Sequence, residues 1–161
     1  MLWIFTIGIS AAIIAIAVMV GQQRGKKLMA EGKIIKRDIS FIESTETFTL
    51  AGVEFAKLTS ALQRMDTGDT GVSWKSKDAA QAIIFQSSHG WNAQLSTLEN
   101  SNDKNRYCFQ FTSWQTRKGI PWRVDTMNML LTAIEKMFLS LDPNTQVETA
   151  RVKTKTKSSF L

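Results

Sequence analysis

The 161-residue sequence has one cysteine, one histidine and only two prolines. A single cysteine, Cys108, cannot form an intramolecular disulfide, and this usage fits a reducing compartment. Because a structural zinc site needs four Cys or His ligands, Cys108 and His89 cannot supply one. The sequence also lacks a phosphate-binding loop and a dinucleotide-binding fingerprint. We therefore expect no metal and no cofactor, and an enzyme is the less favoured class.

Charged side chains are missing from the first part of the chain. Residues 2–20 contain no Asp, Glu, Lys or Arg, and six of these nineteen residues are isoleucine. A helix of this length spans roughly 28 Å, close to the hydrocarbon thickness of a bilayer. The run is longer than the apolar region of a secretory signal peptide and lacks its basic start and its cleavage site. We therefore expect a transmembrane helix over residues 2–20.

Basic residues follow the apolar run closely, and none precedes it. Residues 24–37 contain six basic side chains and one acidic side chain. The positive-inside rule therefore predicts an N-terminus outside the cell and a cytoplasmic C-terminal domain in a single-pass protein. Residues 21–38 are expected to form a basic juxtamembrane stalk. Its cations are expected to contact the bilayer and its anionic headgroups: Arg24, Lys26, Lys27, Lys33, Lys36 and Arg37.

Both ends of the chain carry further membrane-related patterns. Residues 151–161 have four basic and no acidic side chains, which predicts a basic tail or an edge strand. Lys153, Lys155 and Lys157 of this segment are expected at the membrane surface. In the apolar run, small residues four positions apart permit a homo-oligomer or a partner helix: Gly8/Ala12, Ala11/Ala15 and Ala17/Gly21.

The centre of the chain has the composition of one small folded domain. Residues 38–150 contain ten basic and thirteen acidic side chains. A nucleic-acid-binding domain would place Lys and Arg on a folded face, so no nucleic-acid partner is expected. The length allows one hydrophobic core. Alternation of apolar and polar residues, with a continuous apolar run over 81–87, predicts an early strand within 39–50 and then an antiparallel meander: residues 71–76, 81–87, 91–96 and 107–112.

Two amphipathic helices are expected to cover one face of this sheet. The first covers residues 53–65, and the second follows Asp125 as its N-cap and ends before Pro143. Residues 39–150 are therefore predicted to form a soluble α+β domain with an antiparallel sheet of four to six strands. The side of the second helix away from the sheet is expected to carry its polar residues: Asn128, Thr132, Glu135, Lys136 and Ser140.

Aromatic and basic residues gather in and beside the predicted strands, above all in a loop expected over residues 114–122. Tryptophan and arginine anchor many interfaces, although a core rim and a solvated basic loop explain the same pattern without a function. The expected partner or ligand contacts are Trp74, Trp91, Trp114, Arg117, Lys118, Trp122 and Arg123. The favoured function is a membrane-anchored, non-enzymatic domain that binds a protein partner or organises an assembly at the cytoplasmic face.

A membrane-tethered enzyme or small-ligand-binding domain is the alternative function. Its pocket would lie between the sheet and the helices, around Trp74, Trp91 and His89. His89 belongs to a Ser-His-Gly turn, and a Ser–His or Cys–His nucleophile pair is recognised by geometry rather than by spacing. The tertiary structure therefore has to decide between these two classes.

Overall fold

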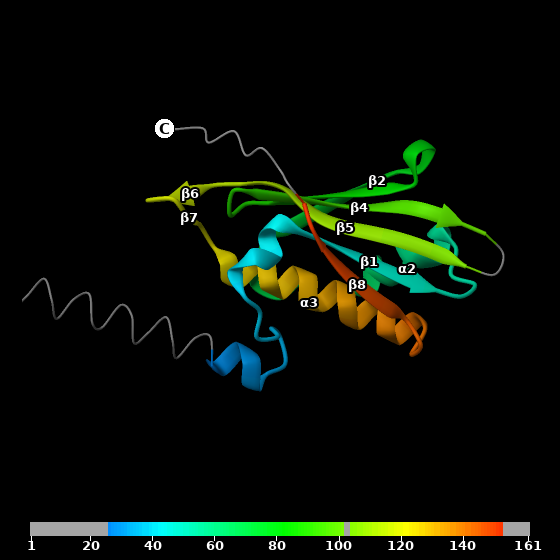
Figure 1. The fold of residues 1–161 in the computed structure, drawn as a ribbon, viewed down its shortest axis with the longest axis horizontal. Helices are drawn as coiled ribbons and strands as arrows, with labels where there is room; N and C mark the ends of the chain where they lie inside the picture. Colours follow the sequence, from blue (N-terminus) through cyan, green and yellow to red (C-terminus); the bar gives the residue numbers. More distant parts are fainter. Residues whose placement is uncertain (1–25, 102–103, 153–161) are drawn as a thin grey trace, which may run out of the picture. The chain divides into compact units, whose positions relative to one another are not determined.

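The computed structural model describes residues 26–101 and 104–152 (Figure 1). The chain divides into two compact units between Lys36 and Arg37. Among the described residues, no helix is both long enough and apolar enough to cross a membrane. The following predicted features lie outside the described residues: the transmembrane helix over 2–20, its small-residue pairs, Arg24, Lys153, Lys155 and Lys157.

The described part of the first unit, residues 26–36, is a short helix followed by a turn. The helix covers residues 26–30, and Gly32 then adopts a left-handed backbone with φ of 66°. The amide of Lys33 donates to the Leu28 carbonyl at 2.8 Å and closes the turn. The lysines of the predicted stalk that fall here have exposed side chains: Lys26, Lys27, Lys33 and Lys36.

The second unit contains one six-stranded antiparallel sheet with the spatial order β2-β3-β4-β5-β1-β8. Its strands are β1 (Ser44–Leu50), β2 (Val72–Lys77), β3 (Ala82–Ser87), β4 (Trp91–Asn100), β5 (Asn105–Trp114) and β8 (Gln146–Arg151). The run from β2 to β5 is the predicted meander. The early strand β1 lies between β5 and β8, so the sheet has six strands and the predicted α+β class is confirmed.

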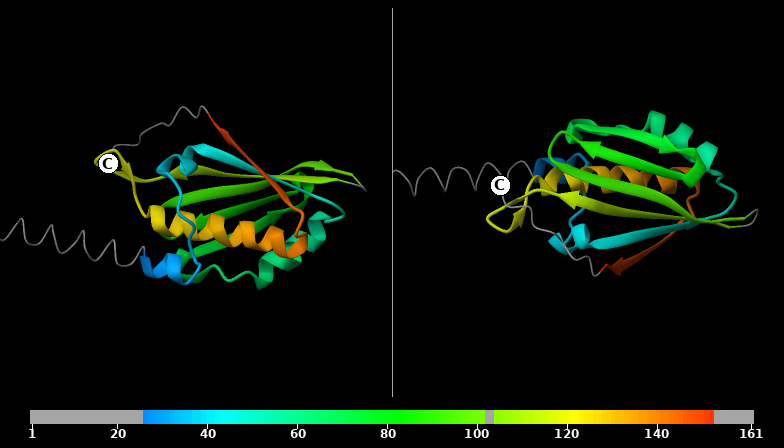
Figure 2. Two further views of the ribbon diagram at one scale, coloured as in Figure 1. Left: turned by 60° about the horizontal axis from the view of Figure 1, so that its bottom comes forward. Right: turned by 90° about the horizontal axis from the view of Figure 1, so that it is seen from above.

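Two helices, α2 (Phe55–Arg64) and α3 (Val124–Leu141), cover one face of the sheet (Figures 1 and 2). Alternate strand residues point toward this face, because strand side chains alternate between the two faces of a sheet. Their apolar side chains join those of the helices in one core cluster, which includes Phe48, Phe85, Leu95, Tyr107, Phe109, Leu58, Leu62, Met127, Leu130 and Phe138. The opposite face carries polar alternates such as Thr47 and Gln94.

Three short 3-10 helices complete the fold: η1 (Ile39–Glu43), η2 (Gly68–Thr70) and η3 (Asp78–Ala80). The first occupies the start of the segment 39–50, within which a strand was expected, and the strand β1 covers the rest. The Asp38 side chain caps η1 by accepting from the Ser40 amide at 2.9 Å, so the strand begins only at Ser44. Local capping therefore overrides the weak alternation at the start of this segment.

The segment between β5 and α3 also differs from the prediction. Residues 114–122 were expected to form a loop, but they contain a hairpin of β6 (Thr116–Arg117) and β7 (Ile120–Pro121). The helix α3 starts directly after this hairpin, with Arg123 at its N-cap position in a left-handed conformation. The expectation that Asp125 caps the helix is therefore wrong, and its carboxylate lies in the first turn instead. A carboxylate in the first turn still interacts favourably with the helix dipole.

Candidate functional site

The β6–β7 hairpin brings together four of the predicted contact residues. Thr116 pairs with Pro121 and Arg117 with Ile120, so Lys118 and Gly119 form the two-residue turn. Both turn residues have positive φ, 52° and 76°, as a type I′ turn requires. We call Arg117, Lys118, Ile120, Trp122 and Arg123 the cationic hairpin.

The two arginines of the cationic hairpin lie against its tryptophan. The Arg117 guanidinium carbon lies 3.7 Å from the centroid of the Trp122 ring, and that of Arg123 lies 5.9 Å away. Such contacts are cation–π interactions, which hold the cations over the ring face. Ile120 is 62% exposed and Trp122 is 36% exposed, so an apolar surface accompanies the charges. This arrangement suits a contact surface and contains no catalytic group.

The other predicted tryptophans belong to the core. Trp74 and Trp114 are half-buried and pack against the core cluster. Trp91 is only 1% exposed, and its indole Nε1–H donates to the Thr126 hydroxyl at 2.9 Å. The expectation that Trp91 contacts a partner or lines a pocket is therefore wrong. Trp91 lies on the same apolar side of β4 as Ala93, and this shared parity already indicated burial.

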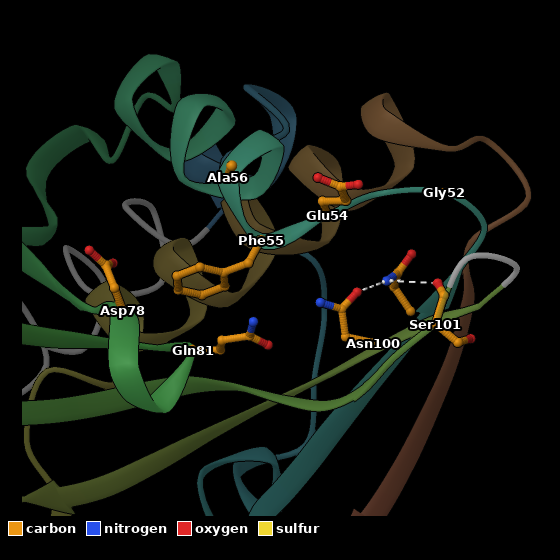
Figure 3. Close-up of a pocket in the computed structure, with 9 residues that line it drawn as sticks. Gly52, Glu54, Phe55, Ala56, Asp78, Gln81, Asn100 and Ser101 are labelled. Carbon is orange, nitrogen blue, oxygen red and sulfur yellow. Dashed lines mark hydrogen bonds between the residues drawn. The ribbon is translucent and has the colours of Figure 1, made fainter.

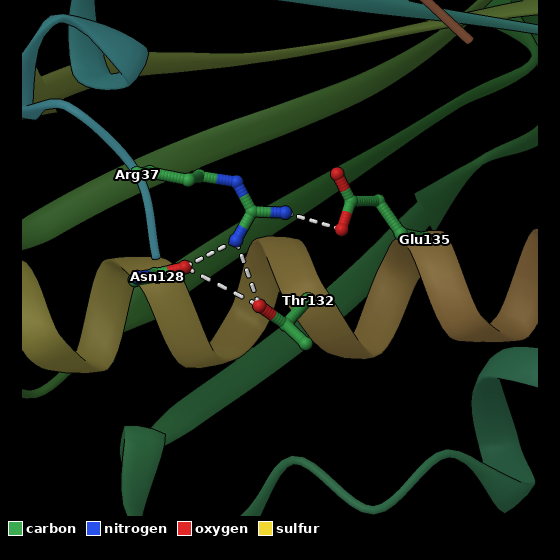
Figure 4. A network of polar contacts seen from close by, with 4 residues as sticks. All are labelled: Arg37, Asn128, Thr132 and Glu135. Carbon is green, nitrogen blue, oxygen red and sulfur yellow. Dashed lines mark hydrogen bonds and ion pairs between the residues drawn. The ribbon is translucent and has the colours of Figure 1, made fainter. Parts of the chain in front are cut away.

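Arg37, expected at the membrane surface, is bound to polar side chains of α3 that were expected on the side of the helix away from the sheet (Figure 4). Its guanidinium donates to Asn128 and to Glu135, and it donates to the Thr132 hydroxyl at 2.8 Å. The side chains of Arg37 and Glu135 are only 11% and 16% exposed. Both expectations are corrected, because the Arg37 side chain is largely buried and donates to three side chains of α3, which are themselves largely buried.

Glu46 of β1 joins this polar cluster from the sheet. Its side chain is 7% exposed, and it lies on the same face of the strand as Phe48. Burial raises its pKa to about 7, the neighbouring Glu135 carboxylate adds to the rise, and the Arg37 charge opposes it. Within the described part of the chain, the Oε2 atom has no hydrogen-bond partner. Glu46 is thus a buried carboxyl whose charge the fold disfavours.

Sequence reasoning missed this cluster because its members come from distant segments. Arg37 and Glu135 are 98 positions apart, and no local pattern links an arginine of the stalk to a polar stripe on α3. One signal was present: Glu46 occupies the strand parity of Phe48 and Leu50, where an unpaired charge is costly. The cluster is therefore structural, and Glu46 is the member whose pKa the fold raises.

A pocket of about 550 Å³ lies at the start of α2 (Figure 3). It is lined by Gly52, Glu54, Phe55, Ala56, Asp78, Gln81, Asn100, Ser101 and Asn105. None of Trp74, Trp91 and His89 lines it, so it is not the pocket that the alternative function expected. Its polar side chains include two carboxylates, Glu54 and Asp78, but neither a histidine nor a cysteine.

The nucleophile pairs considered for the alternative function also find little support. Cys108 pairs with Ser96 in the middle of β4, whereas His89 precedes the first residue of that strand, Trp91, and the strand from Trp91 to Ser96 spans roughly 17 Å. Burial also raises the pKa of the Cys108 thiol, so the thiolate is disfavoured. The Ser87 hydroxyl donates to the Thr70 carbonyl at 2.8 Å. In residues 26–101 and 104–152, no group of three or more His, Cys, Asp or Glu side chains could hold a metal ion.

The edge strand β8 presents a second contact surface. All six of its residues are exposed, and among the described strands it pairs with β1 alone. The Val152 amide donates to the Glu43 carbonyl at 2.9 Å. In an antiparallel pair of strands, opposite residues alternate between hydrogen-bonded and non-hydrogen-bonded pairs. The amides of Val147, Thr149 and Arg151 therefore point away from β1. These groups form an open edge that can accept another strand.

Comparisons with known proteins assign no family to this chain. A scan against protein-family models, a search of curated proteins and a search of solved structures each found no match. The features of the described chain that bear on function are its two contact surfaces, the cationic hairpin and the open edge of β8.

Proposed function

We propose that this protein is a membrane-anchored, non-enzymatic domain that binds a protein partner, or organises an assembly, at the cytoplasmic face of the membrane. The apolar residues 2–20 anchor it as a single transmembrane helix and offer small-residue pairs for a homo-oligomer. The exposed lysines of the stalk meet anionic headgroups: Lys26, Lys27, Lys33 and Lys36. Arg37 is left out of this set, because its donors bind α3.

The observation that carries the partner-binding role is the open edge of β8. Outward amide and carbonyl groups of Val147, Thr149 and Arg151 can bond an added strand, which gives affinity through the main chain. The opposite edge strand, β2, carries Lys75 and Lys77, and lysines on an edge oppose strand addition. The described edge strand β8 carries Glu148 and Arg151 but no lysine, and it is the edge that we assign to the partner.

A proline substitution separates partner binding from folding. Thr149→Pro removes an amide that the β1–β8 ladder does not use, and proline is tolerated at such edge positions. Thr149→Ala is the matched control, since it changes the side chain and keeps the amide. We expect tagged wild type and Thr149→Ala to retain the same partners in affinity purification, and Thr149→Pro to lose them with an unchanged melting temperature. Equal partner recovery from all three chains would refute the assignment.

The orientation is tested with reporters fused to the C-terminus. One reporter fluoresces only in the cytoplasm, and the other is active only outside it. A cytoplasmic signal is the expected result of the charge bias around residues 2–20. An external signal would overturn the cytoplasmic assignment and would move the search for partners to the cell envelope.

A further inference from the structure

We propose that the cationic hairpin is a membrane-contacting tip that inserts among anionic lipid headgroups. This inference goes beyond partner binding at β8, and it rests on the proposed anchoring by residues 2–20. It assigns a lipid surface, and not a protein, to the cations that stack on Trp122. The reasons are the charge, the shape and the rigidity of the hairpin.

The cationic hairpin has a net positive charge, because no acidic side chain in its own segment neutralises its basic residues. Arg117, Lys118 and Arg123 are its three basic residues, and the sequence has no acidic residue between Asp103 and Asp125. Each basic residue near an anionic surface strengthens membrane binding by roughly fivefold. The Arg117 guanidinium lies over the Trp122 ring, and an arginine in a cation–π contact can also bind phosphate through its N–H groups.

The shape of the hairpin favours a bilayer over a protein. Figure 1 shows β6 and β7 projecting beyond the end of the six-stranded sheet, and both views of Figure 2 agree. Ile120 in β7 is 62% exposed. A projecting apolar residue would need a matching pocket on a protein partner, whereas a bilayer interface accepts it at any position. Tryptophan beside long cationic side chains is typical of the interface between headgroups and acyl chains.

The hairpin is also held firmly to the domain. The Trp122 amide donates to the Gln115 carbonyl at 2.8 Å, which closes the base of the hairpin. The Gln115 amide in turn donates to the Gly90 carbonyl at 3.0 Å, in the turn between β3 and β4. A hairpin fixed in this way loses little conformational freedom on contact, which favours binding. Its contact with lipid would therefore also fix how the sheet faces the bilayer.

The test uses an environment-sensitive fluorophore on the full chain reconstituted in lipid vesicles. The labelled variant is Cys108→Ser/Ile120→Cys, and the matched control is Cys108→Ser/Leu98→Cys. Leu98 is also exposed, at 56%, but it lies toward the far end of β4 from the hairpin. Vesicles contain phosphatidylcholine alone or phosphatidylcholine mixed with phosphatidylserine. Vesicle flotation reports anchoring separately from the fluorophore.

We expect the emission of the label at position 120 to shift to shorter wavelength in phosphatidylserine vesicles, and the label at 98 to remain unchanged. The shift should be lost when Arg117→Gln, Lys118→Gln and Arg123→Gln are combined. High salt applied to the original hairpin should reduce it without any substitution, because salt screens exposed charges. This second measurement keeps the proposal testable if the neutralised variant does not fold.

Three results would overturn the proposal. The first is equal emission at position 120 in both kinds of vesicle, and the second is a shift that survives both neutralisation and salt. The third is a shift produced by soluble polyglutamate and not by vesicles, which would assign the hairpin to an acidic protein. Failure of the chain to float with any vesicle refutes the anchor instead, so the two failures are distinguishable.

Discussion

Replacing Glu46 with glutamine should stabilise the protein at alkaline pH and leave its stability unchanged at acidic pH. Glutamine has nearly the same shape as a protonated glutamic acid but cannot ionise. In the folded chain the Glu46 carboxyl is buried between β1 and α3, and the Glu135 carboxylate lies beside it. Ionisation of Glu46 therefore costs free energy in the fold that it does not cost in the unfolded chain.

The size of the effect follows from the pKa difference. The pKa of Glu46 rises from 4.5 to about 7 on folding. Between these two values the folded chain binds more protons than the unfolded chain, so the free energy of unfolding falls as the pH rises, and it levels off above about 7. At roughly 1.4 kcal/mol for each pKa unit, the full loss amounts to about 3 kcal/mol. Glu46→Gln abolishes this loss.

Chemical denaturation of the full chain in detergent, followed by tryptophan fluorescence, measures the free energy of unfolding at acidic and alkaline pH. The control is Glu43→Gln, which removes an exposed carboxylate three residues earlier. We expect the control to behave as wild type at both pH values. Equal stability of wild type and Glu46→Gln at alkaline pH would refute the assignment of a disfavoured charge to Glu46.

Two further predictions concern the groups that hold the domain together. Arg37→Met leaves the Glu135 carboxylate without its buried partner and should lower the free energy of unfolding by about 3 kcal/mol, measured by denaturation at neutral pH. A loss below about 0.5 kcal/mol would mean that solvent replaces the guanidinium. Trp91→Phe removes the indole hydrogen bond to Thr126 and should cost about 1–3 kcal/mol, whereas an unchanged melting temperature would contradict the buried bond.

Most of the fold could be predicted from local patterns. Period-two alternation located β4 and β5, and helical spacing located α2 and α3, because burial on one face imposes these periods. A short apolar run located β3. The helix ends were less accurate. The helix α3 begins after Arg123 because the hairpin ends there, and no acidic residue caps it. The turn of this hairpin is hard to predict, because Gly119 is its one residue with a strong turn signal.

The candidate contact residues were predicted in part, for a physical reason. The residues of the cationic hairpin lie close in sequence, so their proximity in space follows from chain connectivity. Trp91 was assigned to the same surface although its strand parity, shared with Ala93 and Leu95, placed it in the core. The alternation near the C-terminus predicts an edge strand or a basic tail, but only the strand order shows that, among the described strands, β8 pairs with β1 and with no second strand.

The sequence by itself determined the apolar segment, the basic ends and the α+β class, because each follows from composition or from a short period. Only the tertiary structure decided that Arg37 binds α3, that Glu46 is buried against Glu135, and which strand forms the open edge. These features join residues about a hundred positions apart. Their energies depend on desolvation and on approach between segments, and neither quantity is encoded in any one window of the chain.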